Sequence, residues 1–180
     1  MNAFDLSAGL FIRGLTNVKA QLTTAEDHVV ATGGSEVAIL NAQLATNGVA
    51  RDASADLHRY TYAAHVHWAA EGARLAIAQL LGEPAVPAAN DAASFADLHQ
   101  RLDATIAYLR AIVPSDLEAG LDRTIVIERP RGPMRSSGSQ FLLALAIPHF
   151  FYHVTTAYGI LRNQGVQLTM GDFLGNWAAS

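Results

Sequence analysis

The chain has 180 residues, a formal net charge of −4 and no cysteine, and 51% of its residues are hydrophobic. This length predicts a single domain over 1–180, and the lack of cysteine excludes disulfides, thiolate metal sites and a cysteine nucleophile. Only 12 basic residues argue against nucleic acid as a partner. Because no apolar run reaches the roughly 18 residues of a membrane span and the N-terminus lacks the basic start of a signal peptide, we expect a cytoplasmic protein without a membrane partner.

The first half of the chain shows the periodicity of amphipathic helices. Apolar residues recur at steps of three and four over 5–31, which predicts a long helix that ends before Gly33. The short apolar stretch 35–46 is predicted to form a turn of helix or a packed loop. A second long helix is predicted over about 52–81, where Gly82 ends it.

The second half adds two more predicted helices, and between them the sequence pattern changes from that of a helix to that of β-strands. The segment 83–91 is rich in proline and alanine and is predicted to be a linker within the domain. A third helix is predicted over about 95–112. The β-branched run 124–127 and the segment 134–136 flank a Pro-Arg-Gly-Pro turn and predict a small hairpin. With a fourth helix over about 140–163, the sequence predicts an all-α, up-down four-helix bundle whose neighbouring helices are antiparallel.

Two histidines in the last predicted helix have the spacing of metal ligands. His149 and His153 lie four residues apart and therefore on one face, where two imidazoles of one helix can bind a single divalent metal. Leu142, Leu145 and Ile160 share this side of the helix. Apolar surroundings keep imidazoles neutral, as a metal ligand must be, so the pattern predicts a metal site.

A third ligand is expected from the second helix, which offers His58, His65 and His67. A helical wheel places His67 and Glu71 at the edge of the inward arc, and His65 roughly 100° from the centre of that arc. The wheel therefore selects His67, although the other two histidines stay open as ligands. Glu71 is our candidate catalytic base, and it could also be a fourth ligand, an acceptor that orients an imidazole, or the partner of Arg74.

The chain also resembles a known family over nearly its whole length. The resemblance is carried by the phrases FIRGLTNV, ILNAQLA, FADLHQRLDATIAYL, FFYHVTTAYGILRNQGV and GDFLG. They are similar to the bacterial family called domain of unknown function 1993, within the DinB/YfiT-like metal-dependent bundles. The resemblance implies a commonly dimeric four-helix bundle with a hairpin before the last helix. It also implies a metal held by one histidine of the second helix and two of the fourth, which are His67, His149 and His153 here.

Two functional hypotheses follow. The first is a divalent-metal enzyme, with zinc, nickel, manganese or iron in the bundle core, that acts on a small-molecule substrate by hydrolysis or thiol transfer. The second is a metal-free bundle that dimerises or binds a small ligand, with the histidines as polar core residues. The apolar composition and the incomplete histidine sets of other family members motivate the second hypothesis. Under either hypothesis we expect a homodimer.

Overall fold

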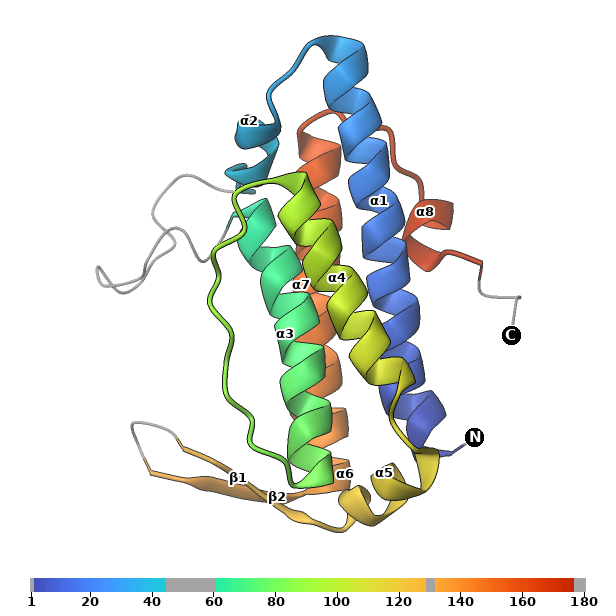
Figure 1. Ribbon diagram of the computed structural model, residues 1–180, viewed down its shortest axis with the longest axis vertical. Helices are drawn as coiled ribbons and strands as arrows, with labels where there is room; N and C mark the ends of the chain where they lie inside the picture. The colour runs from blue at the N-terminus through green and yellow to red at the C-terminus, as the bar shows by residue number, and fades with distance from the viewer. Residues whose placement is uncertain (1, 45–60, 129–131, 177–180) are drawn as a thin grey trace.

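The structure, a computed structural model, describes residues 2–44, 61–128 and 132–176. Four long helices form a bundle (Figure 1). They are α1 (Leu10–Thr32), α3 (Tyr62–Leu81), α4 (Phe95–Arg110) and α7 (Ile147–Asn163). The all-α bundle predicted from the sequence is therefore present. The part of the second predicted helix over 52–60 lies outside the described residues, and so does His58.

The ends of the helices follow the local signals in the sequence. Gly33 and Gly82 end α1 and α3 in the left-handed conformation, with φ of 65° and 76°, which residues with a Cβ rarely adopt. At the start of α4, the Ser94 hydroxyl accepts a hydrogen bond from the backbone N–H of Asp97. These residues fix where the chain leaves and enters the bundle.

Shorter elements surround the four long helices. The helices α2 (Glu36–Leu40), α5 (Pro114–Leu121) and α8 (Met170–Leu174) are one to two turns long. The sequence predicts no helix at α5, where Pro114 occupies the first turn because the missing N–H of proline is tolerated there. The predicted hairpin is confirmed: β1 (Thr124–Ile127) pairs antiparallel with β2 (Met134–Ser137).

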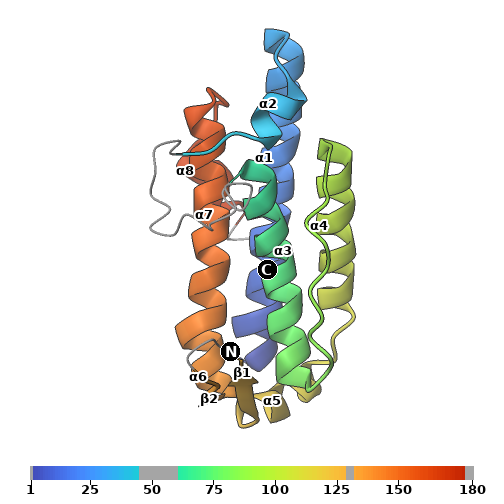
Figure 2. The same ribbon diagram turned by 90° about the vertical axis from the view of Figure 1, so that its left-hand side faces the viewer.

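The direction of α4 differs from the antiparallel order that the sequence predicts. The Tyr108 hydroxyl, near the end of α4, donates to Glu83, just after the end of α3, at 3.1 Å. The two helices are therefore parallel, and residues 83–94, called the strap below, carry the chain back along the bundle (Figures 1 and 2). An extended segment of this length reaches about 40 Å, enough to span a helix of about 30 Å.

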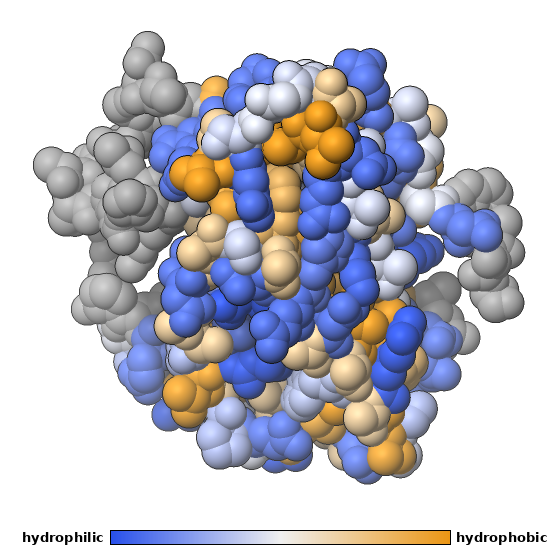
Figure 3. All heavy atoms as spheres, turned by 45° about the horizontal axis from the view of Figure 1, so that its top comes forward, coloured by the Kyte–Doolittle hydropathy of each residue, from blue (hydrophilic) through white to orange (hydrophobic). Residues whose placement is uncertain are grey.

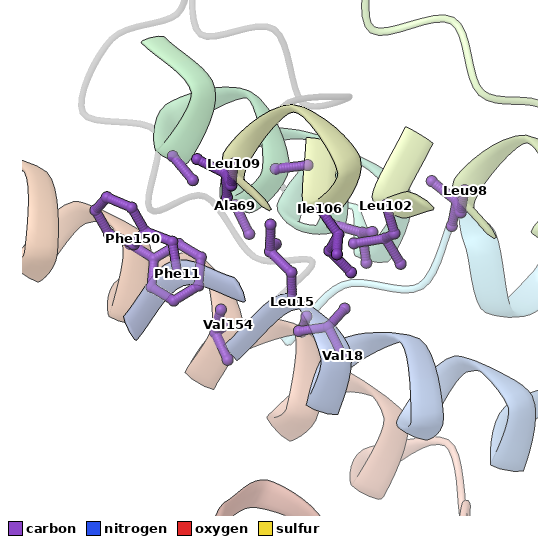
Figure 4. Close-up of a cluster of buried hydrophobic side chains, with 14 of the residues drawn as sticks. Phe11, Leu15, Val18, Ala69, Leu98, Leu102, Ile106, Leu109, Phe150 and Val154 are labelled. Carbon is purple, nitrogen blue, oxygen red and sulfur yellow. The ribbon is translucent and has the colours of Figure 1, made fainter. Parts of the chain in front are cut away.

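Large apolar side chains from the long helices meet along the bundle axis. Phe11 and Leu15 of α1 face Phe150 and Val154 of α7, while Leu102 approaches from α4 (Figure 4). The rings of Phe11 and Phe150 have their centroids 4.9 Å apart. All five side chains are buried, so the core fixes α7 against α1 and thereby positions the polar residues of α7.

The helix before and within α7 is unusually apolar. α6 (Gly138–Phe141) and a π-helical turn over Leu142–Ala146 lead into α7 without a break. The continuous helix 138–163 is long and apolar enough to cross a membrane, by length and composition only. It packs against α1 and α3, and 39% of its most apolar stretch is buried.

Candidate histidine centre

Three histidines meet where α3 packs against α7. The Nδ1 atoms of His65 on α3 and His153 on α7 lie 2.9 Å apart. The Nε2 atom of His153 lies 3.2 Å from Nε2 of His149, one turn earlier on α7. His65, His153 and His149 are called the histidine cluster below. The structure therefore places the two predicted α7 histidines side by side and brings His65 rather than His67 to them.

Exposure increases along the cluster from the inside to the surface. His65 and His153 have only 2% and 8% of their surface exposed, whereas His149 is exposed. Burial lowers the pKa of His65 to about 4. Burial, followed by the neighbouring histidines, lowers the pKa of His153 to about 3, and partial burial also lowers that of His149. All three imidazoles are therefore neutral at pH 7.

Neutral imidazoles in this arrangement form one directional chain. A neutral ring has one N–H and one acceptor nitrogen. His153 uses Nδ1 toward His65 and Nε2 toward His149, so it donates to one neighbour and accepts from the other. The tautomer of His153 therefore fixes the tautomers of both neighbours. The uncharged cluster can therefore exist in two tautomeric arrangements, in which the hydrogen bonds run in opposite directions.

The donor set fits a divalent metal by its chemistry. Three neutral imidazoles are typical ligands of zinc, nickel and iron. Nitrogen separations of 2.9 and 3.2 Å are close to the about 3.3 Å expected between two ligands of one tetrahedral ion. The directions of the nitrogen atoms differ from those around a single ion, because His153 turns Nδ1 toward His65 and Nε2 toward His149. In the described ranges of the chain, no three His, Asp or Glu side chains have the arrangement of a metal site.

Small and aromatic residues shape the surroundings of the cluster. A Cβ on Gly72 of α3 would lie 3.0 Å from Nδ1 of His149, so the missing side chain lets the His149 ring rest on α3. The Tyr152 ring lies edge-on to His65 and His153, with centroids 5.8 and 5.0 Å away. Tyr152 is 54% exposed and therefore borders the cluster on the solvent side.

The other two predicted site residues lie on a different side of α3. His67 and Glu71 are buried, with 0% and 4% exposure, which agrees with the inward direction given by the wheel. Glu71 accepts hydrogen bonds from Arg74 Nε at 3.0 Å, Arg74 Nη2 at 2.7 Å and the Ala88 backbone N–H at 2.7 Å. Burial acts to raise the pKa of Glu71, but these hydrogen bonds and the Arg74 charge outweigh it and hold that pKa below its usual range.

The comparisons with known proteins give the family. The chain matches the family described as domain of unknown function DUF1993 over residues 3–174. It belongs to this family. The solved structure of a DinB family member protein from Shewanella denitrificans is similar to this DUF1993 chain at a TM-score of 0.83 and 27% identity, over 98% of this chain and 94% of that one. No curated protein matches significantly.

These matches confirm the predicted fold class and family. The structural similarity extends over almost the whole of both chains, so the two chains share one overall fold. The DUF1993 chain is therefore a DinB-like bundle with a small hairpin before its last helix.

Proposed function

We propose that this DUF1993 protein binds a divalent metal through His65, His149 and His153, and uses it to act on a small molecule by hydrolysis or thiol transfer. The observation that supports the proposal best is the histidine cluster itself. His153 lies 2.9 Å from His65 and 3.2 Å from His149, measured between ring nitrogens. Zinc, nickel, manganese and iron are the candidate ions.

The residues of the chain have separate roles in this proposal. Burial keeps His65 and His153 unprotonated, so both offer lone pairs at neutral pH. His149 stands at the exposed edge, where a small substrate could reach the cluster beside Tyr152. A divalent ion at this place supplies Lewis acidity, which lowers the pKa of a water or thiol toward neutrality.

The base role predicted for Glu71 stays a prediction. Its carboxylate already accepts three hydrogen bonds, and its lowered pKa makes it a weak proton acceptor near neutral pH. These contacts count against Glu71 as the base.

Metal content tests the proposal directly. Untagged protein is purified without chelator and analysed by elemental mass spectrometry, beside His153→Ala. His99→Ala is the matched control, because His99 is a partly buried histidine on α4 whose Nε2 pairs with Glu26 at 3.2 Å. We expect about one metal ion per chain in the natural protein and the control, and its loss in His153→Ala. Absence of metal after incubation with Zn²⁺ would refute the proposal.

One observation favours a second candidate, a metal-free bundle that binds a small ligand or dimerises. The opposite nitrogens of His153 give a hydrogen-bonded chain that is complete without an ion. Under this alternative, His153→Ala lowers the free energy of unfolding and leaves the metal content unchanged at zero. The same elemental measurement therefore separates the two candidates.

We also propose a homodimer. The helix from Gly138 to Leu161 carries no Asp, Glu, Lys or Arg, and it exposes Leu143 at 62%. Apolar exposed helix faces are typical of subunit interfaces. Sedimentation velocity should give the mass of a dimer, and Leu143→Glu should shift it to that of a monomer. A monomer in the natural protein would contradict this proposal.

A further inference from the structure

A polar cleft of about 450 Å³ lies between α3, α4 and the strap. Glu71 and Arg74 line it from α3, and Asp91 lines it from the strap. Asp97 and Arg101 complete its charged residues from α4. The space-filling view shows a largely hydrophilic surface with small, separate apolar patches (Figure 3). Because sites for small molecules begin at about 300 Å³, the cleft is large enough for a small polar ligand.

The charges of the cleft are already compensated. Arg74 Nη2 lies 2.7 Å from Glu71 Oε1, and Arg101 Nη2 lies 2.7 Å from Asp91 Oδ1. Asp97 accepts a backbone hydrogen bond at 2.9 Å and lies in the first turn of α4, where the helix dipole stabilises a negative charge. A charged ligand therefore finds no free charge of opposite sign in this lining, which favours a neutral molecule.

Several polar groups of the cleft remain available to such a molecule. Thr105 is only 5% exposed, and its hydroxyl lines the cleft without a hydrogen-bond partner in the described part of the chain. One turn earlier on the same face of α4, Arg101 uses Nη2 toward Asp91 and keeps Nη1 for a ligand. The exposed amide of Gln100 and the second carboxylate oxygen of Asp91 add one further donor and two acceptors.

The Thr105 hydroxyl distinguishes this wall from an ordinary polar surface. Threonine hydroxyls in a helix commonly bond to the carbonyl four residues earlier. Thr16 and Thr24 of α1 do so, at 2.8 and 3.2 Å, but Thr105 does not, although it is the most buried of the three. A mostly buried hydroxyl without a partner is unfavourable. A ligand in the cleft can supply the missing hydrogen bond, since the cleft is the open space that Thr105 lines.

We propose that this cleft binds a neutral polyhydroxyl compound of the monosaccharide type. A ligand hydroxyl both donates and accepts, so it suits a wall that offers donors and acceptors together. Its hydroxyls donate to Asp91, accept from Arg101 Nη1 and Gln100, and satisfy Thr105. The cleft and the histidine cluster share only α3, so the proposal is independent of the metal.

Nuclear magnetic resonance of the full-length, ¹⁵N-labelled protein tests the proposal, with D-glucose and D-galactose as probes. Amide shifts locate the site, and each sugar is compared with its uronate and its 2-amino form, which add a negative or a positive charge to the same ring. Thr105→Val removes the hydroxyl and keeps the shape of the side chain. Thr16→Val is the matched control, because the Thr16 hydroxyl is already bonded within its own helix. Gln100→Ala, at an exposed position, is a second test that does not disturb the core.

We expect at least one of the two sugars to shift the amides of the strap and of residues 100–105, and both charged forms to bind more weakly. Thr105→Val and Gln100→Ala should each weaken binding by about two- to tenfold, as the loss of one neutral hydrogen bond does. Thr16→Val should leave binding unchanged, and metal content should be the same in all variants. Absence of shifts with both sugars, tighter binding of a charged form, or full affinity in both Thr105→Val and Gln100→Ala would overturn the proposal.

Discussion

The contact between Glu71 and the strap gives the sharpest prediction for stability. Glu71→Gln keeps the size of the side chain and removes its charge. The carboxylate is only 5% exposed and accepts hydrogen bonds from Arg74 and from the Ala88 N–H. Loss of a partner in a buried ion pair destabilises by about 3–5 kcal/mol. Because Arg74 is 28% exposed and can turn toward water, we expect a smaller loss, about 2–3 kcal/mol.

Urea unfolding followed by circular dichroism measures this loss, and Asp103→Asn is the matched control. Asp103 pairs with Lys19 on the surface, with side chains 56% and 37% exposed, so its neutralisation should change the free energy of unfolding by less than about 1 kcal/mol. Hydrogen exchange at the Ala88 amide should accelerate in Glu71→Gln alone. Equal effects of the two substitutions on stability would refute the reasoning that this pair anchors the strap.

Glu71 also predicts a pH dependence. Its folded pKa lies below that of the unfolded chain, so the stabilisation is present above the unfolded pKa of about 4.3 and is lost as the pH falls through the folded value. Unfolding measured in urea from pH 7 to pH 3 should show this loss in the natural protein. Glu71→Gln should show less of it, and an unchanged pH profile in that variant would contradict the assignment.

Three further perturbations have defined outcomes. Buried His65 has a pKa of about 4 in the folded protein and about 6.5 in the unfolded chain. The free energy of unfolding should therefore fall by about 3 kcal/mol for this residue as the pH drops from 6.5 to 4. Urea unfolding at a series of pH values should show a smaller fall in His65→Gln. Gly120→Ala would place a Cβ against the Leu80 carbonyl oxygen and should lower the unfolding free energy by at least about 2 kcal/mol in urea. Gly72→Ala should displace His149 and weaken Zn²⁺ binding measured by calorimetry, with full affinity counting against the cluster as a metal site.

The structure explains why the sequence could place the two α7 histidines together but not the α3 residue that contacts them. His149 and His153 lie on one helix, so their spacing alone fixes their relation. The third residue depends on how two helices face each other. α3 is buried on almost all sides, and its inward arc is shared between α7 and α4. A wheel centred on the mean apolar direction favours His67, although His65 is the residue that contacts His153.

The same two-sided burial separates the polar residues of α3 into two groups. His65 and Gly72 face α7, whereas His67, Glu71 and Arg74 lie toward α4 and the strap. The sequence placed His67 and Glu71 one turn apart on one face, which is correct. It could not show that this face meets Arg101, because residues 95–110 reach it only through the strap.

The elements were predictable to the extent that their signals are local. Glycines and Ser94 mark the helix ends, and β-branched residues mark β1. The parallel course of α4 depends on contacts such as Tyr108 with Glu83, which no local pattern reveals. The π-helical turn over Leu142–Ala146 lies just before Pro148, which has no backbone N–H to donate to the preceding turn. The proline therefore indicates an irregular helix at this place, but it does not show that the irregularity is a π-helical turn.

A comparison of His65→Ala with His67→Ala tests the central claim most directly. Zn²⁺ affinity of the two variants and of the natural protein is measured by calorimetry, with circular dichroism to verify the fold. We predict that His65→Ala weakens binding by at least about tenfold, since one ligand is lost, and that His67→Ala leaves it unchanged. Loss of binding in His67→Ala with full affinity in His65→Ala would contradict the proposed histidine centre.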